Sequence, residues 1–271
     1  MDNNEIKIGL VAVGYQCDKY LRQVLAPWVS LKCGVWDEDL GVQVERPKLN
    51  IKICCTTALF KEYNEMGHQY DNERTESILS DYKKSGAIDE FIVVKDPIVD
   101  HQSRNYCLDY FRQFDIDLFW QLDLLDEIYT QEDILSILGF VRENRLIEWY
   151  RINFKNYVGD TKHYIEGFNP PRIHWAKRHG GISRWHWDNN VTYNNGRRDT
   201  SYPHLIVPPN IACVKHYSWC GSDQFLKNKI NYQKKCLGTC SYLWDERKGL
   251  VFNQEYYNKT RQLVPELKID E

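Results

Sequence analysis

The 271-residue sequence has no apolar run that approaches the roughly 20 residues needed to span a bilayer as a helix. Its N-terminus, MDNNEIKIGLVAVG, is acidic and polar before a short apolar run, which differs from a secretory signal peptide. Internal repeats and low-complexity linkers are also missing. These absences predict a single domain with no membrane span and a cytoplasmic location.

Charge of one sign is not in excess either. The chain has 35 basic and 38 acidic residues and a net charge of -3, so nothing global draws it to nucleic acid or to an anionic membrane. Any basic patch must therefore be local. With 42% hydrophobic and 27% charged residues, the composition is that of an ordinary soluble globular protein.

The nine cysteines lack the paired spacing of a zinc site. Cys236 and Cys240, with His216 nearby in the sequence, suggest zinc ligands, but a second ligand pair is missing. Cys54 and Cys55 lie in an apolar run, where cysteine behaves as a small hydrophobic residue. We therefore expect reduced thiols, as in cytosolic proteins.

The first half of the chain alternates predicted strands and helices. The strands are Ile6–Val13, Leu49–Leu59, Ile88–Val94 and Ile116–Leu122. The helices are Asp18–Leu31, with Asp18 as the N-cap, Asn72–Lys84, Asp100–Phe114 and Asp133–Arg142. This alternation predicts an α/β fold with a mostly parallel sheet covered on both faces. Neither G-x-G-x-x-G nor G-x-x-x-x-G-K-[ST] follows the first strand, so a dinucleotide fold and a P-loop are not supported.

The second half is less regular. Ile147–Tyr157 and Ile211–Trp219 are predicted strands, and Asp223–Lys234 is a predicted helix. Residues 166–198 are irregular and rich in Asn, Gly and Arg, and such long segments are more often functional than idle. Their local basic charge fits a phosphorylated or nucleic-acid acceptor, although solvated loop charges are the commoner outcome.

The most informative stretch is FWQLDLLDEIYT, residues 119–130, called the acidic segment below. A buried strand leads directly into Asp123, Asp126 and Glu127, and buried carboxylates need water, a partner charge or a metal. Ligands bind at the carboxyl ends of strands in open α/β sheets, and carboxylates there suit Mg²⁺ or Mn²⁺ with a diphosphate substrate. Alternatively, Asp126 and Glu127 simply cap the helix that begins near Gln131. The residues alone leave both interpretations open.

Four segments together resemble a known family. IGLVAVGYQCDKYL is similar to a strand–P-T-Y-N–helix opening, with Val13 to Gln16 in place of P-T-Y-N. Ser103-Arg104-Asn105 is similar to an A-R-N segment, and LDLLDEIYT to L-D-x-D-E-x-Y-T. HYSW at 216–219, with the residues up to 232, is similar to H-x-x-W…K-x-x-x-Y. In this order the segments resemble a GT-A fold glycosyltransferase, closest to the family 2-like enzymes. One departure is that Asp123 and Asp126 are separated by two residues instead of one.

The resemblance implies a single GT-A-like, Rossmann-like domain over 1–271. Residues 6–145 would bind the nucleotide sugar, 146–245 would form an irregular acceptor side, and 246–271 would be a tail that wraps or is mobile. The resemblance implies a Mn²⁺ or Mg²⁺ ion held by Asp126, Asp123 and His216. It also implies donor contacts from Val13, Gly14, Tyr15, Thr56, Arg104 and Asp123, with Thr57 beside Thr56.

The implied activity is hexosyl transfer from a nucleotide-diphosphate sugar, UDP- or GDP-linked, to a hydroxyl of a glycan or another acceptor, with inversion. Asp188 in WHWDN is the predicted base, because flanking aromatic rings raise a carboxyl pKa by desolvation. Asp160 and Asp199 are reserve candidates. An Asx turn is the alternative role for Asp188, and an ordinary hydrogen-bonded histidine for His216.

Other interpretations stay open at this stage. Arg104 either reaches the diphosphate, pairs with an acidic residue or makes a surface salt bridge, and Lys215 beside His216 is a possible phosphate contact. Alternative functions are glycosylation of modified bases in DNA, hydrolysis or nucleotidyl transfer at the diphosphate, and non-catalytic binding. The enzymatic interpretation requires that the acidic segment hold a cation. Carboxylates saturated by arginines would count against it.

Overall fold

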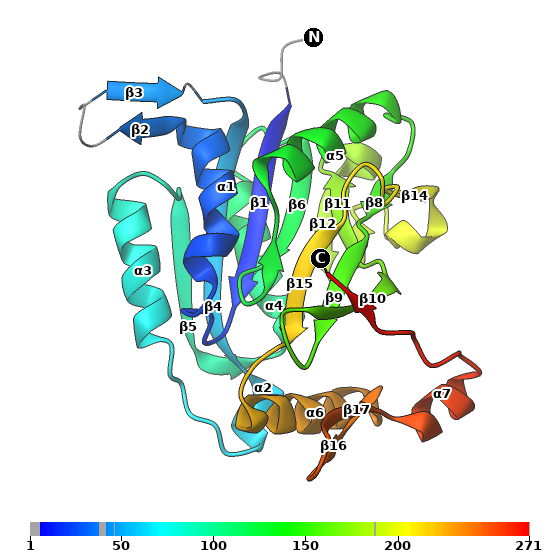
Figure 1. The fold of residues 1–271 in the computed structure, drawn as a ribbon. Coiled ribbons are helices and arrows are strands. Elements are labelled where there is room, and N and C mark those ends of the chain that lie inside the picture. Colours follow the sequence, from blue (N-terminus) through cyan, green and yellow to red (C-terminus); the bar gives the residue numbers. More distant parts are fainter. Residues whose placement is uncertain (1–5, 38–41, 46, 187, 271) are drawn as a thin grey trace.

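The computed structural model describes residues 6–37, 42–45, 47–186 and 188–270. A seven-stranded sheet, in the order β14-β8-β11-β6-β1-β4-β5, forms its centre (Figure 1). Its parallel part consists of β6 (Leu118–Asp123), β1 (Lys7–Gly14), β4 (Asn50–Phe60) and β5 (Glu90–Ile98). The other strands are β11 (Pro171–Trp175), antiparallel to both its neighbours, β8 (Trp149–Arg151) and β14 (His204–Ile206). The predicted mixed α/β fold with a mostly parallel sheet is therefore confirmed.

Helices cover both faces of this sheet, as the alternation predicts. Leu10 and Ala12 of β1 belong to a core cluster shared with helices α1 (Leu21–Cys33), α3 (Glu73–Lys84) and α5 (Gln131–Glu143). Val11, which lies between them in sequence, belongs to a cluster on the other face with α4 (Asp100–Phe111). Val11 belongs to a different cluster from Leu10 and Ala12 because successive side chains of a strand point to opposite faces of the sheet. Both faces of β1 are thus buried.

A second sheet has the strand order β18-β10-β9-β15-β7, and its strand β7 follows the carboxyl end of β6 after a short turn. It consists of β7 (Glu127–Ile128), β9 (Phe154–Val158), β10 (His163–Phe168), β15 (Val214–Trp219) and β18 (Lys268–Ile269). Because β7 begins with Glu127, the last carboxylate of the acidic segment, and pairs with β15, Glu127 lies opposite His216. This pairing joins two segments that lie far apart in the sequence.

The remaining elements are short, apart from the helix α6 (Asp223–Leu237) near the molecule's lower end (Figure 1). They are α2 (Lys61–Glu65), α7 (Gln254–Thr260), the 3-10 turns η2 (Arg178–Gly180) and η3 (Asp199–Ser201), and the hairpins β2–β3 (Val35–Asp37, Val42–Glu45), β12–β13 (Ile182–Trp185, Val191–Tyr193) and β16–β17 (Tyr242–Asp245, Gly249–Phe252).

Three local predictions are wrong. Helix α1 begins at Leu21 with Tyr20 at the N-cap, so Asp18 does not cap it. The predicted strand 147–157 is two strands, β8 and β9, that belong to different sheets. Asp126 and Glu127 do not cap α5, because Thr130 is its N-cap and exchanges hydrogen bonds with Asp133. The capping interpretation of the acidic segment is thereby excluded.

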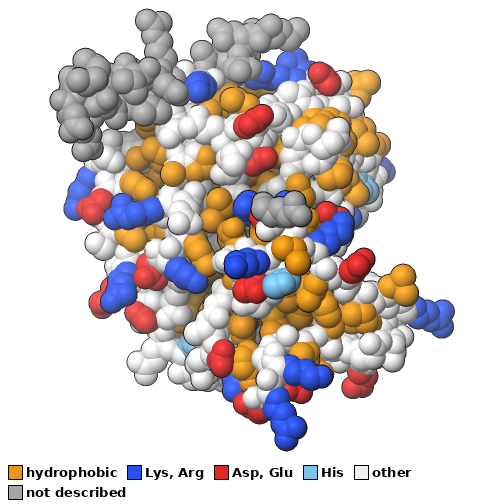
Figure 2. All heavy atoms as spheres, viewed as in Figure 1, with side chains coloured by type: hydrophobic (Ala, Val, Ile, Leu, Met, Phe, Trp, Pro, Cys, Tyr) orange, Lys and Arg blue, Asp and Glu red, His pale blue; other side chains and the backbone are white. Residues whose placement is uncertain are grey.

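Two further features bear on function. Basic and acidic side chains alternate over the face seen in Figure 2, without a large area of one sign. In the part of the chain that the structure describes, no helix is long and apolar enough to cross a membrane. The cytoplasmic location stays a prediction.

Candidate functional site

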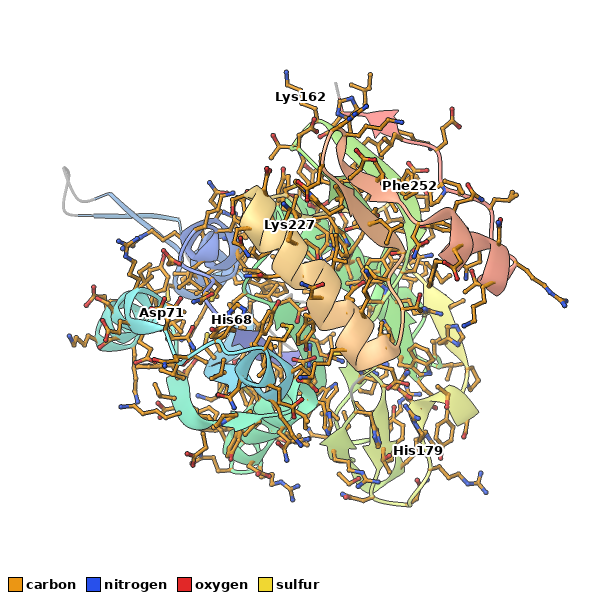
Figure 3. The ribbon with its side chains drawn as sticks, turned by 90° about the horizontal axis from the view of Figure 1, so that it is seen from below. His68, Asp71, Lys162, His179, Lys227 and Phe252 are labelled. Carbon is orange, nitrogen blue, oxygen red and sulfur yellow. The ribbon has the colours of Figure 1, made fainter. Side chains whose placement is uncertain are left out.

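A cavity of about 260 Å³ lies at the carboxyl ends of β1 and β6. Gly14 ends the first strand and Asp123 ends the second, so the cavity lies where ligands bind in open α/β sheets. Helix α6 contributes the wall opposite the strands. In Figure 3, which views the molecule from below, α6 crosses the centre with Lys227 on it and His68 beside α2. The wall residues from α6 are Phe225, Asn228, Lys229, Tyr232 and Gln233.

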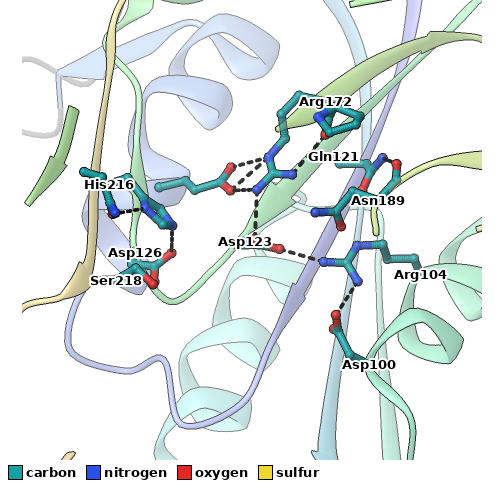
Figure 4. A network of polar contacts seen from close by, with 12 residues as sticks. Asp100, Arg104, Gln121, Asp123, Asp126, Arg172, Asn189, His216 and Ser218 are labelled. Carbon is teal, nitrogen blue, oxygen red and sulfur yellow. Dashed lines mark hydrogen bonds and ion pairs between the residues drawn. The ribbon is translucent and has the colours of Figure 1, made fainter. Parts of the chain in front are cut away.

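Asp123 stands at the centre of a charged network with two arginines (Figure 4). Its Oδ1 accepts a hydrogen bond from Arg104 Nη2 at 3.0 Å, and its Oδ2 accepts one from Arg172 Nη2 at 3.0 Å. Arg172 Nε also donates to Glu127 Oε1 at 2.9 Å, and Arg104 Nη1 donates to Asp100 Oδ2 at 2.9 Å. We call these five residues the arginine network. Both carboxylate oxygens of Asp123 are engaged by it.

The arginine network sets the protonation of its acids. Burial disfavours the charged form of Asp123, but the Arg172 and Arg104 guanidinium groups outweigh this and lower its pKa to about 2. Complete burial raises the pKa of Glu127 well above its ordinary value, and Arg172 opposes the shift only in part. Arg172 is itself buried and beyond deprotonation. The network is a fixed, charge-compensated unit at the base of the cavity.

Asp126 belongs to a second polar group. Its Oδ1 lies 3.4 Å from His216 Nε2, and its Oδ2 lies 3.8 Å from Lys229 Nζ. Burial disfavours the ionised carboxylate, but His216 and Lys229 lower the pKa of Asp126. His216 Nδ1 is 2.7 Å from Asn156 Oδ1, which fixes the ring. Lys229 Nζ donates to the carbonyl and the hydroxyl of Ser218, and burial lowers the pKa of Lys229.

Aromatic rings form another part of the cavity wall. Tyr63 and Tyr232 stack with ring centroids 4.4 Å apart, and Tyr15 lies 5.4 Å from Tyr63 and 6.3 Å from Phe60. These rings come from α2, α6 and the ends of β1 and β4. They offer flat apolar surface on which a base or a sugar ring can stack.

The residues present do not fit the predicted metal ion. Both oxygens of Asp123 are held by guanidinium groups, which leaves Asp126 without the second carboxylate that the resemblance implies. Among the described residues, no group of three or more His, Cys, Asp or Glu side chains is arranged to hold a metal. Coordination by Asp123, Asp126 and His216 together therefore has no support in this geometry. The arginine contacts are the outcome that counts against the metal-dependent enzyme predicted from the sequence, so an enzyme at this site would have to stabilise its leaving group with protein side chains.

Most of the residues predicted from the sequence do meet in the cavity. Those that line it are Val13, Gly14, Tyr15, Arg104, Asp123, Asp126 and His216. Thr56 is not among the described lining residues, because it is fully buried and lies 3.1 Å from Cys107 Sγ. Thr57 is also fully buried, within 3.5 Å of the Tyr70 hydroxyl.

The predicted base, Asp188, is not brought into the cavity. Both its oxygens accept hydrogen bonds from Arg198 Nη2, at 2.8 and 2.7 Å. Burial raises its pKa, but Asn190 and Arg198 outweigh this and lower it, against the expected rise. Its neighbour Asn189 accepts a hydrogen bond from Gln121, two residues before Asp123, so the loop adjoins the arginine network. Trp187 of the same motif lies outside the described residues.

The other candidates lie elsewhere. Asp160 is half exposed and contacts His163. Asp199 is fully buried, and its Oδ2 lies 2.9 Å from His174 Nε2. Lys215 pairs with Asp270 at 3.1 Å instead of facing the cavity.

Sequence reasoning missed Arg172, Lys229 and Tyr63. Arg172 lies in the segment predicted to be irregular, and no motif marks it. Lys229 had a usable signal: with Phe225 and Tyr232 it follows the i, i+4, i+7 spacing of one helix face.

No protein-family model and no curated protein matches the sequence. Solved structures of S. aureus TarS match in part. For TarS 1-349 in complex with UDP-GlcNAc the TM-score is 0.36 at 14% identity, over 56% of this chain and 35% of that one. For TarS 1-349 in complex with UDP it is 0.39 at 12% identity, over 86% and 66%. For TarS itself it is 0.40 at 11% identity, over 76% and 38%.

The chain thus spans between about a third and two thirds of the TarS chains that it matches. Similarity at this level leaves the family of the chain open. The functional proposal therefore rests on the geometry of the cavity.

Proposed function

We propose that the chain is a glycosyltransferase that binds a nucleotide-diphosphate sugar in this cavity and moves the sugar to an acceptor hydroxyl. One observation carries the proposal. At the carboxyl ends of two parallel strands, stacked tyrosines and the basic side chains of Arg104, His216 and Lys229 line the same cavity. Aromatic faces suit a base, and cationic donors suit a diphosphate.

The reaction needs negative charge on the leaving nucleoside diphosphate to be stabilised. Lys229 and Arg104 place N–H donors at the cavity beside the carboxylates that partner them, and both side chains are held by hydrogen bonds before any ligand arrives. Such preorganised donors stabilise developing charge at little reorganisation cost. Asp188 remains the proposed base for the acceptor hydroxyl, although it lies outside the cavity and would have to release Arg198 to act. Inversion is the proposed stereochemical outcome.

The proposed acceptor is a hydroxyl of a glycan or another compound. Two basic residues of the segment considered for DNA are paired with acidic side chains, Arg178 with Glu148 and Arg198 with Asp188. Modified DNA therefore serves as one acceptor in the assays and not as a second proposal.

Donor binding is tested by isothermal titration calorimetry with UDP-glucose, UDP-GlcNAc and GDP-mannose, each with and without Mn²⁺. We expect at least one donor to bind. Tyr232→Ala removes a ring from the cavity wall and should weaken that donor at least about tenfold, as the loss of one stacked base or ring does. Tyr256→Ala is the control, because Tyr256 lies on α7 and does not line the cavity.

Product analysis then separates the alternatives. Nucleoside diphosphate with a glycoside supports transfer, and nucleoside monophosphate indicates hydrolysis or nucleotidyl transfer at the diphosphate. Binding without turnover of any donor would favour a non-catalytic module. If no donor binds the wild type, or if Tyr232→Ala binds as tightly as Tyr256→Ala, the assignment of the cavity is contradicted.

A further inference from the structure

The acidic side chains of the acidic segment are already in contact with protein cations. Each oxygen of Asp123 accepts a hydrogen bond from a different arginine at 3.0 Å. Glu127 is fully buried and held by Arg172. A divalent ion would have to displace guanidinium groups that are themselves at most 4% exposed. Two fixed positive charges beside Asp123 repel a divalent ion, so binding there is unfavourable.

The space beside the remaining carboxylate is also taken by basic groups. Asp126 has His216 Nε2 at 3.4 Å on one oxygen and Lys229 Nζ at 3.8 Å on the other. His216 is fixed from behind by Asn156, and its ring packs against Phe154 at 5.0 Å. The ammonium group of Lys229 therefore lies where it would repel a cation bound to Asp126, whereas the spacing of His216 and Asp126 alone would allow both to be ligands.

Lys229 has a hydrogen-bond donor left for a ligand. Its ammonium group has three hydrogens, and two of them are used by the carbonyl and hydroxyl oxygens of Ser218. Its distance to Asp126, 3.8 Å, is beyond hydrogen-bond range. Lys229 also lines the cavity, as does Arg104, whose Nε has no hydrogen-bond partner in the described structure.

We propose that Lys229, supported by His216 and Arg104, binds the diphosphate of the donor directly, so that the site works without a divalent metal ion. This inference rests on the proposed function and specifies how its leaving group is stabilised. Ser218 fixes the lysine through two hydrogen bonds, and Asp126 lies between Lys229 and His216. The arginine network beside them is charge-compensated. No metal ligand is needed from Asp123.

The test is isothermal titration calorimetry of the full chain with UDP, GDP and inorganic pyrophosphate, first in EDTA and then, for the nucleotides, in Mn²⁺. We expect the wild type to bind a nucleoside diphosphate in EDTA with an affinity within about threefold of that in Mn²⁺. Lys229→Met should weaken nucleotide and pyrophosphate binding at least about tenfold, as loss of a charge-assisted contact does. Lys229→Arg keeps the positive charge and should retain more of the affinity than Lys229→Met.

Lys227→Met is the matched control, since Lys227 lies on the same helix but pairs with Glu246 at 3.2 Å and does not line the cavity. It should bind like the wild type. Circular dichroism and the unfolding midpoint check that Lys229→Met is folded. If this variant is unfolded, Ser218→Ala, which removes one support of the lysine, replaces it and should also weaken pyrophosphate binding.

Two results would overturn the inference, and each is distinct from failure of the proposed function. Binding of UDP or GDP that disappears in EDTA and returns with Mn²⁺ would show a metal-dependent site while leaving the transferase proposal intact. Equal binding by Lys229→Met and Lys227→Met would show that the lysine does not hold the diphosphate. Absence of binding under every condition would instead contradict the proposed function itself.

Discussion

Arg172, which no sequence motif marks, connects two carboxylates of the candidate site. Its guanidinium group reaches Glu127 on β7 and Asp123 at the end of β6, and it lies over the Phe154 ring at 5.3 Å. The side chain is 2% exposed, so its charge is compensated by these contacts and not by water.

Replacement of Arg172 by Met should lower the free energy of unfolding by about 3–5 kcal/mol, because Glu127 is left buried without its partner. Arg172→Lys should also destabilise, since an ammonium group does not reproduce the forked contact. Urea denaturation measures both. Arg112→Met is the control, because its ion pair with Asp109 is exposed, and we expect it to change stability little. An Arg172→Met protein as stable as Arg112→Met would contradict the role given to the network.

Asp188 tests the proposed catalytic step at a single residue. Asp188→Asn should lower turnover by about a hundredfold or more and leave the donor dissociation constant unchanged, as loss of a general base does. Asp160→Asn, at the reserve candidate beside His163, should retain wild-type turnover. Steady-state kinetics together with donor titration measure the two effects. Unchanged turnover in Asp188→Asn would remove Asp188 from the mechanism.

At the scale of elements, the end of β1 must approach its neighbours closely to form the cavity wall. A Cβ atom at Gly14 would lie 2.7 Å from Cys17 Sγ and 3.0 Å from Leu124 Cβ. Gly139, inside α5, has nothing within 4 Å of the corresponding position. The two glycines therefore form a matched pair with opposite expected effects.

Gly14→Ala should destabilise the chain by about 1–3 kcal/mol through overpacking and should weaken donor binding. Gly139→Ala should stabilise α5 by up to about 1 kcal/mol, because alanine is the better helix former. Thermal unfolding followed by donor titration measures both. A Gly14→Ala protein with unchanged stability would show that the turn between β1 and α1 tolerates a side chain.

The strand β18 pairs with β10, and the carboxylate of Asp270 adds further contacts beside it. Asp270 accepts hydrogen bonds from Lys155 Nζ at 2.6 Å, from Tyr157 and from Lys215 Nζ at 3.1 Å. These contacts, the Lys155 one foremost, hold the pKa of Asp270 well below its usual range. A lowered carboxyl pKa adds stability that is present above the pKa of the unfolded chain and is lost as the pH falls below it.

We therefore expect β18 to lose protection from hydrogen exchange as the pH falls below about 4, the ordinary aspartate range. Asp270→Asn should show the same loss at neutral pH, because the amide cannot replace the charged contacts. Hydrogen exchange by mass spectrometry, corrected for the intrinsic effect of pH, resolves the segment. Protection of β18 that does not change with pH or in Asp270→Asn would contradict this role.

For the molecule as a whole, local patterns predicted the first half well. Continuous apolar runs such as Ile6–Val13 and the helical spacing of 18–31 correspond to β1 and α1, because both elements bury themselves in the same core. The second half was harder to predict from the sequence, because its strands are short and the strands that they pair with are distant in sequence. β11 pairs with β6, about fifty residues earlier, and nothing local to residues 171–175 indicates that pairing.

The candidate site follows the same division. Tyr15, Arg104, Asp123, Asp126 and His216 were predicted from local motifs, and the structure brings them to one cavity. The local pattern did not predict that both oxygens of Asp123 bind arginines, because the second arginine, Arg172, lies 49 residues later in the sequence. The metal site was predicted without knowledge of this Arg172 contact.

The decisive experiment is a crystal structure of the chain, grown in EDTA, with whichever of UDP and GDP binds more tightly in calorimetry. We expect the diphosphate against Lys229 and His216, with the base in the cavity among Tyr15, Tyr63 and Tyr232. A nucleotide bound at another surface, or a cavity that stays empty at saturating nucleotide, would contradict this expectation.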